Sequence, residues 1–157
     1  MNKMKRRIFL KGGLAGSVIA IAAGSGLLRP TEVLAASWPK SAFGAKNMKD
    51  ALQNLFGSSS TTTSKAIKIK APLQAENGAV VPISITTSLP DVETIAIVVE
   101  KNPSPLATSL NTTGASGFYS ARIKMGKTSP VHAVVKSKGK LYSAKKIVKV
   151  TVGGCGG

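Results

Sequence analysis

The sequence predicts an all-β protein, an immunoglobulin-like antiparallel β-sandwich preceded by a short helix, on three observations. Short segments rich in β-branched residues alternate between apolar and polar positions in the second half of the chain. Turn-forming residues separate them at intervals too short for the helical crossovers of a parallel sheet. The 157 residues, 43% of them hydrophobic, are enough for one domain and disfavour two.

The first 35 residues have the three parts of an export signal. Basic residues including Arg6 and Arg7 come first, a weakly apolar run follows, and Val33-Leu34-Ala35 forms a small-residue cleavage site. The adjacent arginines resemble the twin-arginine signal, which a receptor reads at the bacterial inner membrane. We therefore expect residues 1–35 to be removed and the mature protein to be periplasmic. An uncleaved membrane anchor is the alternative.

The mature chain remains strongly basic. Removing residues 1–35 takes away six basic residues and one acidic residue, which leaves 16 basic and 5 acidic residues and a net charge of +11. Such a surface favours small oxyanions, anionic membranes or acidic protein partners, unless it serves solubility alone. We expect no nucleic-acid partner, because the charge is scattered, no nucleic-acid-binding motif is present and the export signal directs the chain elsewhere.

Residues 36–64 are expected to form an N-terminal helix and a polar connector. Apolar residues recur at the spacing of one helix face over residues 46–56. Asn47 is the expected N-cap and Gly57 the expected stop. Residues 57–64 contain only Gly, Ser and Thr, so we predict a loop there.

Residues 65–152 carry the predicted sandwich. Apolar and polar residues alternate, or β-branched residues form a run, in six segments of this part of the chain. These patterns predict strands at 65–70, 80–89, 95–99, 118–125, 131–135 and 140–152. Six or seven such strands are typical of an immunoglobulin-like domain, although the single cysteine leaves no intersheet disulfide. In the last segment Ile147 and Val148 cannot both face one core without a β-bulge, so the register of this strand stays open.

We expect the chemistry at the carboxyl terminus, which reads Gly153-Gly154-Cys155-Gly156-Gly157. Glycine is costly to order and buries nothing, so these five residues favour a flexible arm over a packed element. Flexible-chain statistics give this arm a root-mean-square reach of roughly 12 Å and an extended limit of about 17 Å. A thiol on such an arm can enter a narrow cleft of another protein.

No residue set for catalysis or metal binding is evident in the sequence. One cysteine and one histidine cannot form a cysteine-rich zinc site or an internal disulfide. His132 lies in a valine-rich segment and is interpreted as a sheet residue, with no nucleophile and base beside it. The nearest cation to Cys155 is Lys149, and the terminal carboxylate opposes thiolate formation. We therefore predict no catalytic residue, no metal, no cofactor and no enzyme activity, and a partner must activate the thiol.

Four segments of the chain together have the sequence of a known family: 76–82 (Glu-Asn-Gly-Ala-Val-Val-Pro), 101–107 (Lys-Asn-Pro-Ser-Pro-Leu-Ala), 122–125 (Arg-Ile-Lys-Met) and 148–157, which ends in the terminal motif. They resemble the SoxY family of sulfur carriers in bacterial thiosulfate oxidation. The likeness spans most of the mature domain. Its most specific part is the terminal motif, because it combines a sequence, a position and an export signal.

The resemblance implies a periplasmic carrier subunit that forms a heterodimer with SoxZ, a second immunoglobulin-like protein. In this family a haem protein, SoxAX, conjugates the terminal cysteine with thiosulfate to give a cysteine S-thiosulfonate. A hydrolase, SoxB, then releases sulfate, and a molybdenum-haem sulfane dehydrogenase, where present, oxidises the remaining sulfur. The resemblance makes Cys155 the covalent attachment point and Gly153, Gly154, Gly156 and Gly157 its flexible arm.

The residues alone leave three other interpretations open. The first is a secreted immunoglobulin-like binding or assembly module whose Cys155 forms an intermolecular disulfide, since an odd cysteine outside the cytoplasm suggests pairing between chains. The second is a periplasmic thiol enzyme, which would turn over thiosulfate by itself. The third is an inert thiol on a frayed end.

Overall fold

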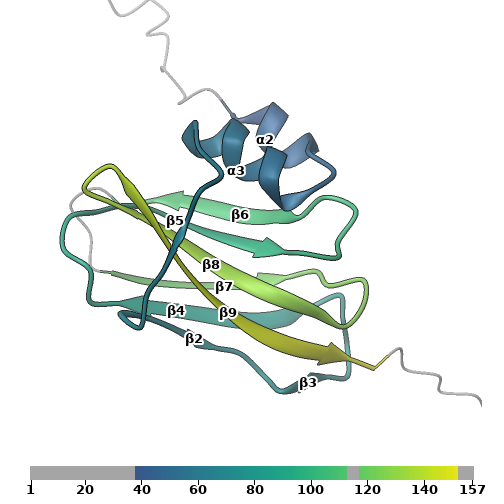
Figure 1. Cartoon of the computed structure of the whole chain (residues 1–157). Coiled ribbons are helices and arrows are strands. Elements are labelled where there is room, and N and C mark those ends of the chain that lie inside the picture. The colour runs from purple at the N-terminus through teal and green to yellow at the C-terminus, as the bar shows by residue number, and fades with distance from the viewer. Residues whose placement is uncertain (1–37, 113–116, 152–157) are drawn as a thin grey trace, which may run out of the picture. The chain divides into compact units, whose positions relative to one another are not determined.

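The computed structural model describes residues 38–112 and 117–151 (Figure 1). The chain divides into two compact units, Met1–Trp38 and Pro39–Gly157, and every described helix and strand belongs to the second. The predicted signal with Arg6 and Arg7, and the predicted arm with Cys155, lie outside the described residues. The elements are α2 Lys40–Gly44, α3 Met48–Phe56, β1 Thr62–Thr63, β2 Ile67–Lys70, β3 Gln74–Ala75, β4 Val81–Thr87, β5 Val92–Val99, β6 Leu106–Asn111, β7 Phe118–Ile123, β8 Ser129–Ser137 and β9 Lys140–Val150.

Two sheets form the sandwich. The larger sheet has the strand order β1-β9-β8-β5-β6, with β3 also paired to β9, and the smaller sheet has the order β2-β4-β7 (Figure 1). Neighbouring strands pair antiparallel, except that the two-residue strands β1 and β3 run parallel to β9. The prediction of an immunoglobulin-like antiparallel sandwich preceded by a short helix is confirmed.

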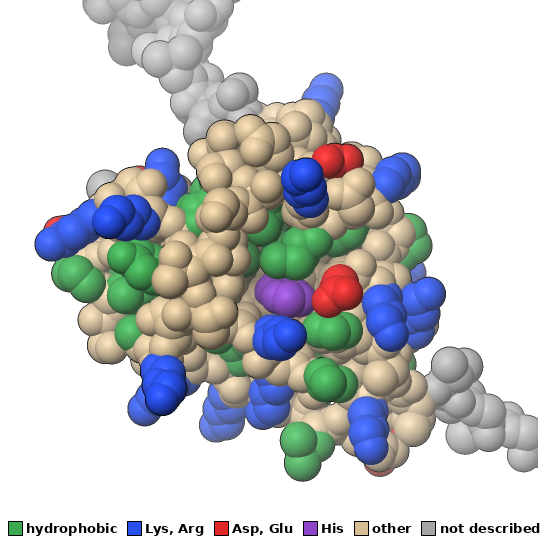
Figure 2. All heavy atoms as spheres, in the orientation of Figure 1, with side chains coloured by type: hydrophobic (Ala, Val, Ile, Leu, Met, Phe, Trp, Pro, Cys, Tyr) green, Lys and Arg blue, Asp and Glu red, His purple; other side chains and the backbone are tan. Residues whose placement is uncertain are grey.

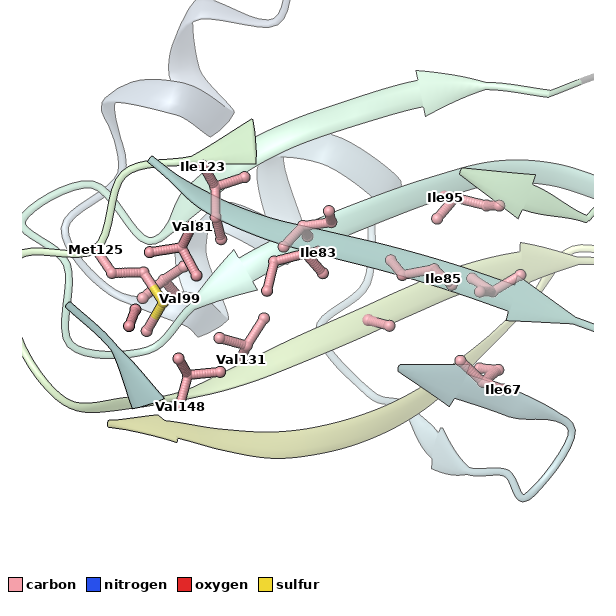
Figure 3. Packing of buried hydrophobic residues seen from close by; sticks show 14 residues of the cluster. Ile67, Val81, Ile83, Ile85, Ile95, Val99, Ile123, Met125, Val131 and Val148 are labelled. Carbon is pink, nitrogen blue, oxygen red and sulfur yellow. The ribbon is translucent and has the colours of Figure 1, made fainter. Parts of the chain in front are cut away.

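The core lies between the sheets because alternate residues of the facing strands are apolar. Val81, Ile83 and Ile85 of β4 are buried and point toward the larger sheet, where Val131 and Val148 belong to the same cluster (Figure 3). Full burial of such a side chain contributes about 1.5–3 kcal/mol. This cluster therefore provides the main hydrophobic stabilisation of the sandwich.

The last strand has a single register that the sequence left open. Val148 is fully buried, whereas Ile147 is 61% exposed on the outer face of the larger sheet. The pairing of β9 with β8 shows no register shift from Lys140 to Val148. No bulge is needed, because β9 leaves Ile147 on the outer surface.

A pair of helices covers part of the outer face of the larger sheet. Leu52 of α3 and Ala42 of α2 are buried in a second cluster with Val98 of β5 and Val134 of β8. The sequence did not predict α2, because five residues are too few to show a helical repeat. Neither helix among the described residues has the length and apolar character needed to cross a membrane.

Three strands were missed in the sequence. β6 is a half-polar edge strand, Leu-Ala-Thr-Ser-Leu-Asn, so it lacks the clean alternation of a strand with one buried face. β1 lies inside the connector predicted as a loop, at Thr62–Thr63, and β3 is equally short. Both short strands depend on pairing with β9, which is distant in the sequence, and local pattern cannot reveal such pairing.

Loss of the predicted helix cap should weaken the protein measurably. The Asp50 amide donates to Asn47 Oδ1 at 2.8 Å, and Gly57 ends the helix in the left-handed conformation with φ 76°, as the sequence predicts. We expect Asn47→Ala to lower the free energy of unfolding by about 1 kcal/mol in urea denaturation. An Asn47→Ser variant is the control: it keeps an accepting oxygen without placing a second carboxylate beside Asp50, whose Oδ2 accepts from Asn47 Nδ2 at 2.7 Å, and it should stay nearer to wild type than the alanine variant.

Candidate functional site

The last strand is held firmly up to the point where the predicted arm begins. The Lys149 amide donates to the Leu73 carbonyl at 3.0 Å, and the Thr151 amide donates to the Ala75 carbonyl at 3.1 Å. On the other side, the Val150 amide donates to Thr128 Oγ1 at 2.9 Å. We call Val150 and Thr151 the arm base. Hydrogen bonds from two neighbouring segments fix its direction.

A surface pocket of about 440 Å³ lies beside the arm base. Its lining includes both residues of the arm base, one acidic and one basic side chain, and the turn before β4. Among the lining residues are Glu76, Asn77, Gly78, Lys124, Val150 and Thr151. Gly78 lies too close to residue 125 to carry a side chain. Its carbonyl accepts from the Met125 amide at 2.7 Å, and the Met125 carbonyl oxygen is only 2.4 Å from the position that a Cβ at residue 78 would take.

A second loop is tied to the same end of the sandwich by one side chain. The side-chain Nδ2 of Asn102 donates to the Lys124 carbonyl at 2.7 Å, and its Oδ1 accepts from the Gly126 backbone amide at 3.1 Å. A further pocket of about 430 Å³ lies between these loops, and Lys124 and Gly126 line both pockets. Asn102 therefore joins the β5–β6 turn to the loop after β7.

The three internal segments that carry the family resemblance thus meet at one end of the molecule. Residues 76–82, 101–107 and 122–125 contribute Gly78, Asn102 and Lys124 to the two pockets next to the arm base. Their residue types alone indicate no role for these segments beyond the resemblance. The Asn-Pro pair at 102 and the Asn-Gly pair at 77 marked turns, yet only the fold shows that the turns lie together.

The single histidine lies apart from this end of the chain. His132 Nε2 is 3.1 Å from Glu100 Oε2, and its side chain is only 14% exposed. Figure 2 shows the histidine on the outer sheet face beside a carboxylate. Its interpretation as a sheet residue agrees with its place in β8. A pocket of about 230 Å³ between His132, Lys145 and Met48 lies next to it.

The two threonine hydroxyls at the arm base are hydrogen-bonded to the backbone. The hydroxyls of Thr128 and Thr151 donate to backbone carbonyls, at 3.4 Å and 3.3 Å, so neither is paired with a base that would activate it. Over residues 38–112 and 117–151, no group of three or more His, Cys, Asp or Glu side chains is placed to hold a metal ion.

These features define a class of protein, a small β-sandwich whose final strand is anchored at its end and continues toward a glycine-flanked cysteine. The chain belongs to the SoxY family, since the family model described as "Sulfur oxidation protein SoxY" matches residues 52–155. A similar solved structure is the sulfur carrier protein SoxY from Chlorobium limicola f thiosulfatophilum, with a TM-score of 0.61 and 41% identity. That match covers 68% of this chain and 97% of the other. No curated protein matches the chain.

Proposed function

We propose that the protein is a periplasmic carrier that holds sulfur intermediates of thiosulfate oxidation covalently on Cys155. The observation that carries the proposal is the match to the SoxY family, which extends to residue 155 and so includes the terminal thiol. The relative from Chlorobium is itself a sulfur carrier. The carrier is not an enzyme in this proposal, because partners perform each chemical step on the cargo.

The anchored arm base supports this role by its geometry. Cys155 follows Thr151, the last described residue, by four positions. Four residues span at most about 14 Å when extended, which is enough to carry a thiol from the sandwich surface into the active-site cleft of another protein. A fixed starting point and a short glycine-rich segment together limit the volume that the thiol searches, and so raise its effective concentration near a docked partner.

In the proposed reactions, the Cys155 sulfur is the only atom of this chain that forms or breaks a bond. Loading joins the Cys155 thiolate to the sulfane sulfur of thiosulfate, gives Cys–S–S–SO3⁻, and passes two electrons to the haem protein. Hydrolysis of the terminal S–S bond with one water then releases sulfate and two protons and leaves the persulfide Cys–S–S⁻. A sulfane dehydrogenase, where present, oxidises the outer sulfur of the persulfide with three waters to Cys–S–SO3⁻, with release of six protons and six electrons, and a second hydrolysis with one water releases sulfate and two protons and regenerates the thiolate. Without a dehydrogenase, the thiolate of another acceptor takes up the outer sulfur as its own persulfide.

The partners follow from the family and from the sheet edges. We propose a heterodimer with a SoxZ-like β-sandwich, and transient complexes with a SoxAX-like haem protein, a SoxB-like hydrolase and, where present, a sulfane dehydrogenase. In the described structure β6 ends the larger sheet, and β2 and β7 end the smaller one. Open edges of this kind suit pairing with a second sheet protein.

Intact mass spectrometry tests the proposal. Protein purified from thiosulfate-grown cells should carry sulfur-containing adducts that a thiol reductant removes. A protein that stays unmodified in every growth condition would contradict covalent carriage. A disulfide-linked dimer that must remain oxidised for function, seen on non-reducing gels, would instead favour the binding or assembly module.

A further inference from the structure

The outer face of the smaller sheet is basic and carries no acidic residue. Lys68 and Lys70 alternate with the inward Ile67 in β2, and Arg122 is exposed in β7. Exposed Lys124 follows directly after β7. None of β2, β4 and β7 contains Asp or Glu. We call the surface formed by Lys68, Lys70, Arg122 and Lys124 the basic face.

Most of the acidic residues lie on the opposite sheet, where they pair with part of its basic residues and leave Lys140, Lys145 and Lys149 of β9 without a salt bridge among the described residues. Three of the five acidic residues beyond position 35 contact cations or the histidine there: Asp91 with Lys138 at 3.6 Å, Glu93 with Lys136 at 3.2 Å, and Glu100 with His132 at 3.1 Å. The Gly139 amide and Lys136 lower the pKa of Glu93 by hydrogen bonding. Among the described residues, the four cations of the basic face form no salt bridge.

The centre of the basic face carries serine hydroxyls beside a lysine. Lys70, Ser84 and Ser120 lie side by side across the three strands, and the Ser84 and Ser120 hydroxyls are hydrogen-bonded at 2.9 Å. A face that inserts into a bilayer needs a continuous set of large apolar side chains. Here the exposed apolar side chains Val80 and Phe118 lie at opposite ends of the sheet, because Val80 directly precedes β4 and Phe118 pairs near the other end of that strand. Short hydroxyls between cations are better suited to the carboxylates of another protein.

The basic face adjoins the arm base. Lys124 lines the same pocket as Val150 and Thr151; Glu76 also lines this pocket but forms no salt bridge with Lys124. A protein seated on the basic face would therefore lie next to the point from which Cys155 extends. Unpaired surface charges of one sign raise the rate of encounter with an oppositely charged protein and orient it.

We propose that the basic face is the docking surface for an acidic surface on the enzymes that process Cys155. This inference rests on the proposed carrier function and adds how those enzymes find the arm. The same electrostatic field would serve several enzymes in turn, since it attracts each of them without the tight contacts that would hold one on the carrier.

The test compares two double variants of the full chain with the same change of charge. Lys70→Glu with Arg122→Glu reverses the middle of the basic face, and Lys40→Glu with Lys49→Glu makes the same change on α2 and α3, over the other sheet. Each protein is loaded at Cys155 with tetrathionate, from which the thiolate displaces thiosulfate and leaves Cys–S–S–SO3⁻. Sulfate release by the SoxB-like hydrolase of the same cell is then measured against carrier concentration and salt.

We expect the basic-face variant to lower kcat/KM about tenfold at low ionic strength with kcat unchanged, and the difference to fade as salt rises from about 20 mM to about 500 mM. The helix variant should stay within about twofold of wild type. Equal effects of both variants, or none, would overturn the proposal. The proposal would also be overturned if the basic-face variant bound phosphatidylglycerol vesicles more weakly than wild type but released sulfate with the same kcat/KM. That result would assign the basic face to lipid binding. Failure of tetrathionate-loaded wild type to release any sulfate would instead count against the carrier function itself.

Discussion

A Cys155→Ala protein should fold like the wild type and reduce thiosulfate-dependent sulfate formation to the level of cells that lack the protein. The loss should be complete because the proposed cargo bond is made to the Cys155 sulfur and the chain has one cysteine. The two described core clusters are complete within the sandwich and its helices, so we expect the unfolding transition not to move. Growth of a complemented deletion strain on thiosulfate, with sulfate assayed in the medium, measures the effect.

Two controls make this experiment decisive. A Cys155→Ser protein keeps the size and polarity of the side chain, and should be as inactive as the alanine variant because a serine hydroxyl cannot form the persulfide. Circular dichroism and urea unfolding should match for all three proteins. Normal sulfate formation by either variant would mean that another atom carries the sulfur.

A Gly78→Ala protein should be destabilised by about 3 kcal/mol, and more than any surface substitution. A Cβ at this position would lie 2.4 Å from the Met125 carbonyl oxygen and 2.9 Å from Val150 Cγ1. The carbonyl cannot move freely, because the neighbouring Met125 amide is hydrogen-bonded to Gly78 at 2.7 Å. The same displacement would push on Val150 and so on the arm base.

Urea denaturation of a matched pair tests this. Gly44→Ala adds the same methyl group at a helix position with no atom within 4 Å of the new Cβ, and its stability should be equal or slightly greater. Equal stability of the two variants would show that the turn at Gly78 tolerates a side chain. If Gly78→Ala also slows sulfate formation at a temperature where it remains folded, the position of the arm base matters for the delivery of Cys155.

Strands could be predicted from the sequence where one or both faces of the strand are buried. β4 and β2 alternate cleanly and β8 is a β-branched run, so their positions followed from local pattern. α3 was predicted with its cap and its stop because Asn47 and Gly57 act locally. α2, β1, β3 and β6 were not predicted, since their stability comes from distant partners and not from their own sequence.

The candidate site divides in the same way. The glycine-flanked thiol was evident in the sequence because its chemistry is contained in five consecutive residues. The pockets beside the arm base, the Asn102 bridge between two loops and the basic face each combine residues from separate strands. Their sequence signals were turn residues and alternating lysines, which predict turns and an exposed strand face. They do not predict that the two pockets, the Asn102 bridge and Lys124 of the basic face lie together beside the arm base.

The most direct test of the central claim follows the two sulfur atoms of thiosulfate separately. Wild-type carrier is incubated with the SoxAX-like and SoxB-like proteins and with thiosulfate labelled at either the sulfane or the sulfone sulfur, then digested with trypsin without reductant. Cleavage after Lys149 leaves Val150–Gly157 as a peptide that contains the thiol. Sulfane label should be found on this peptide as a Cys155 persulfide, and sulfone label should appear as free sulfate. Sulfate formation without sulfane label on this peptide would contradict covalent carriage by Cys155.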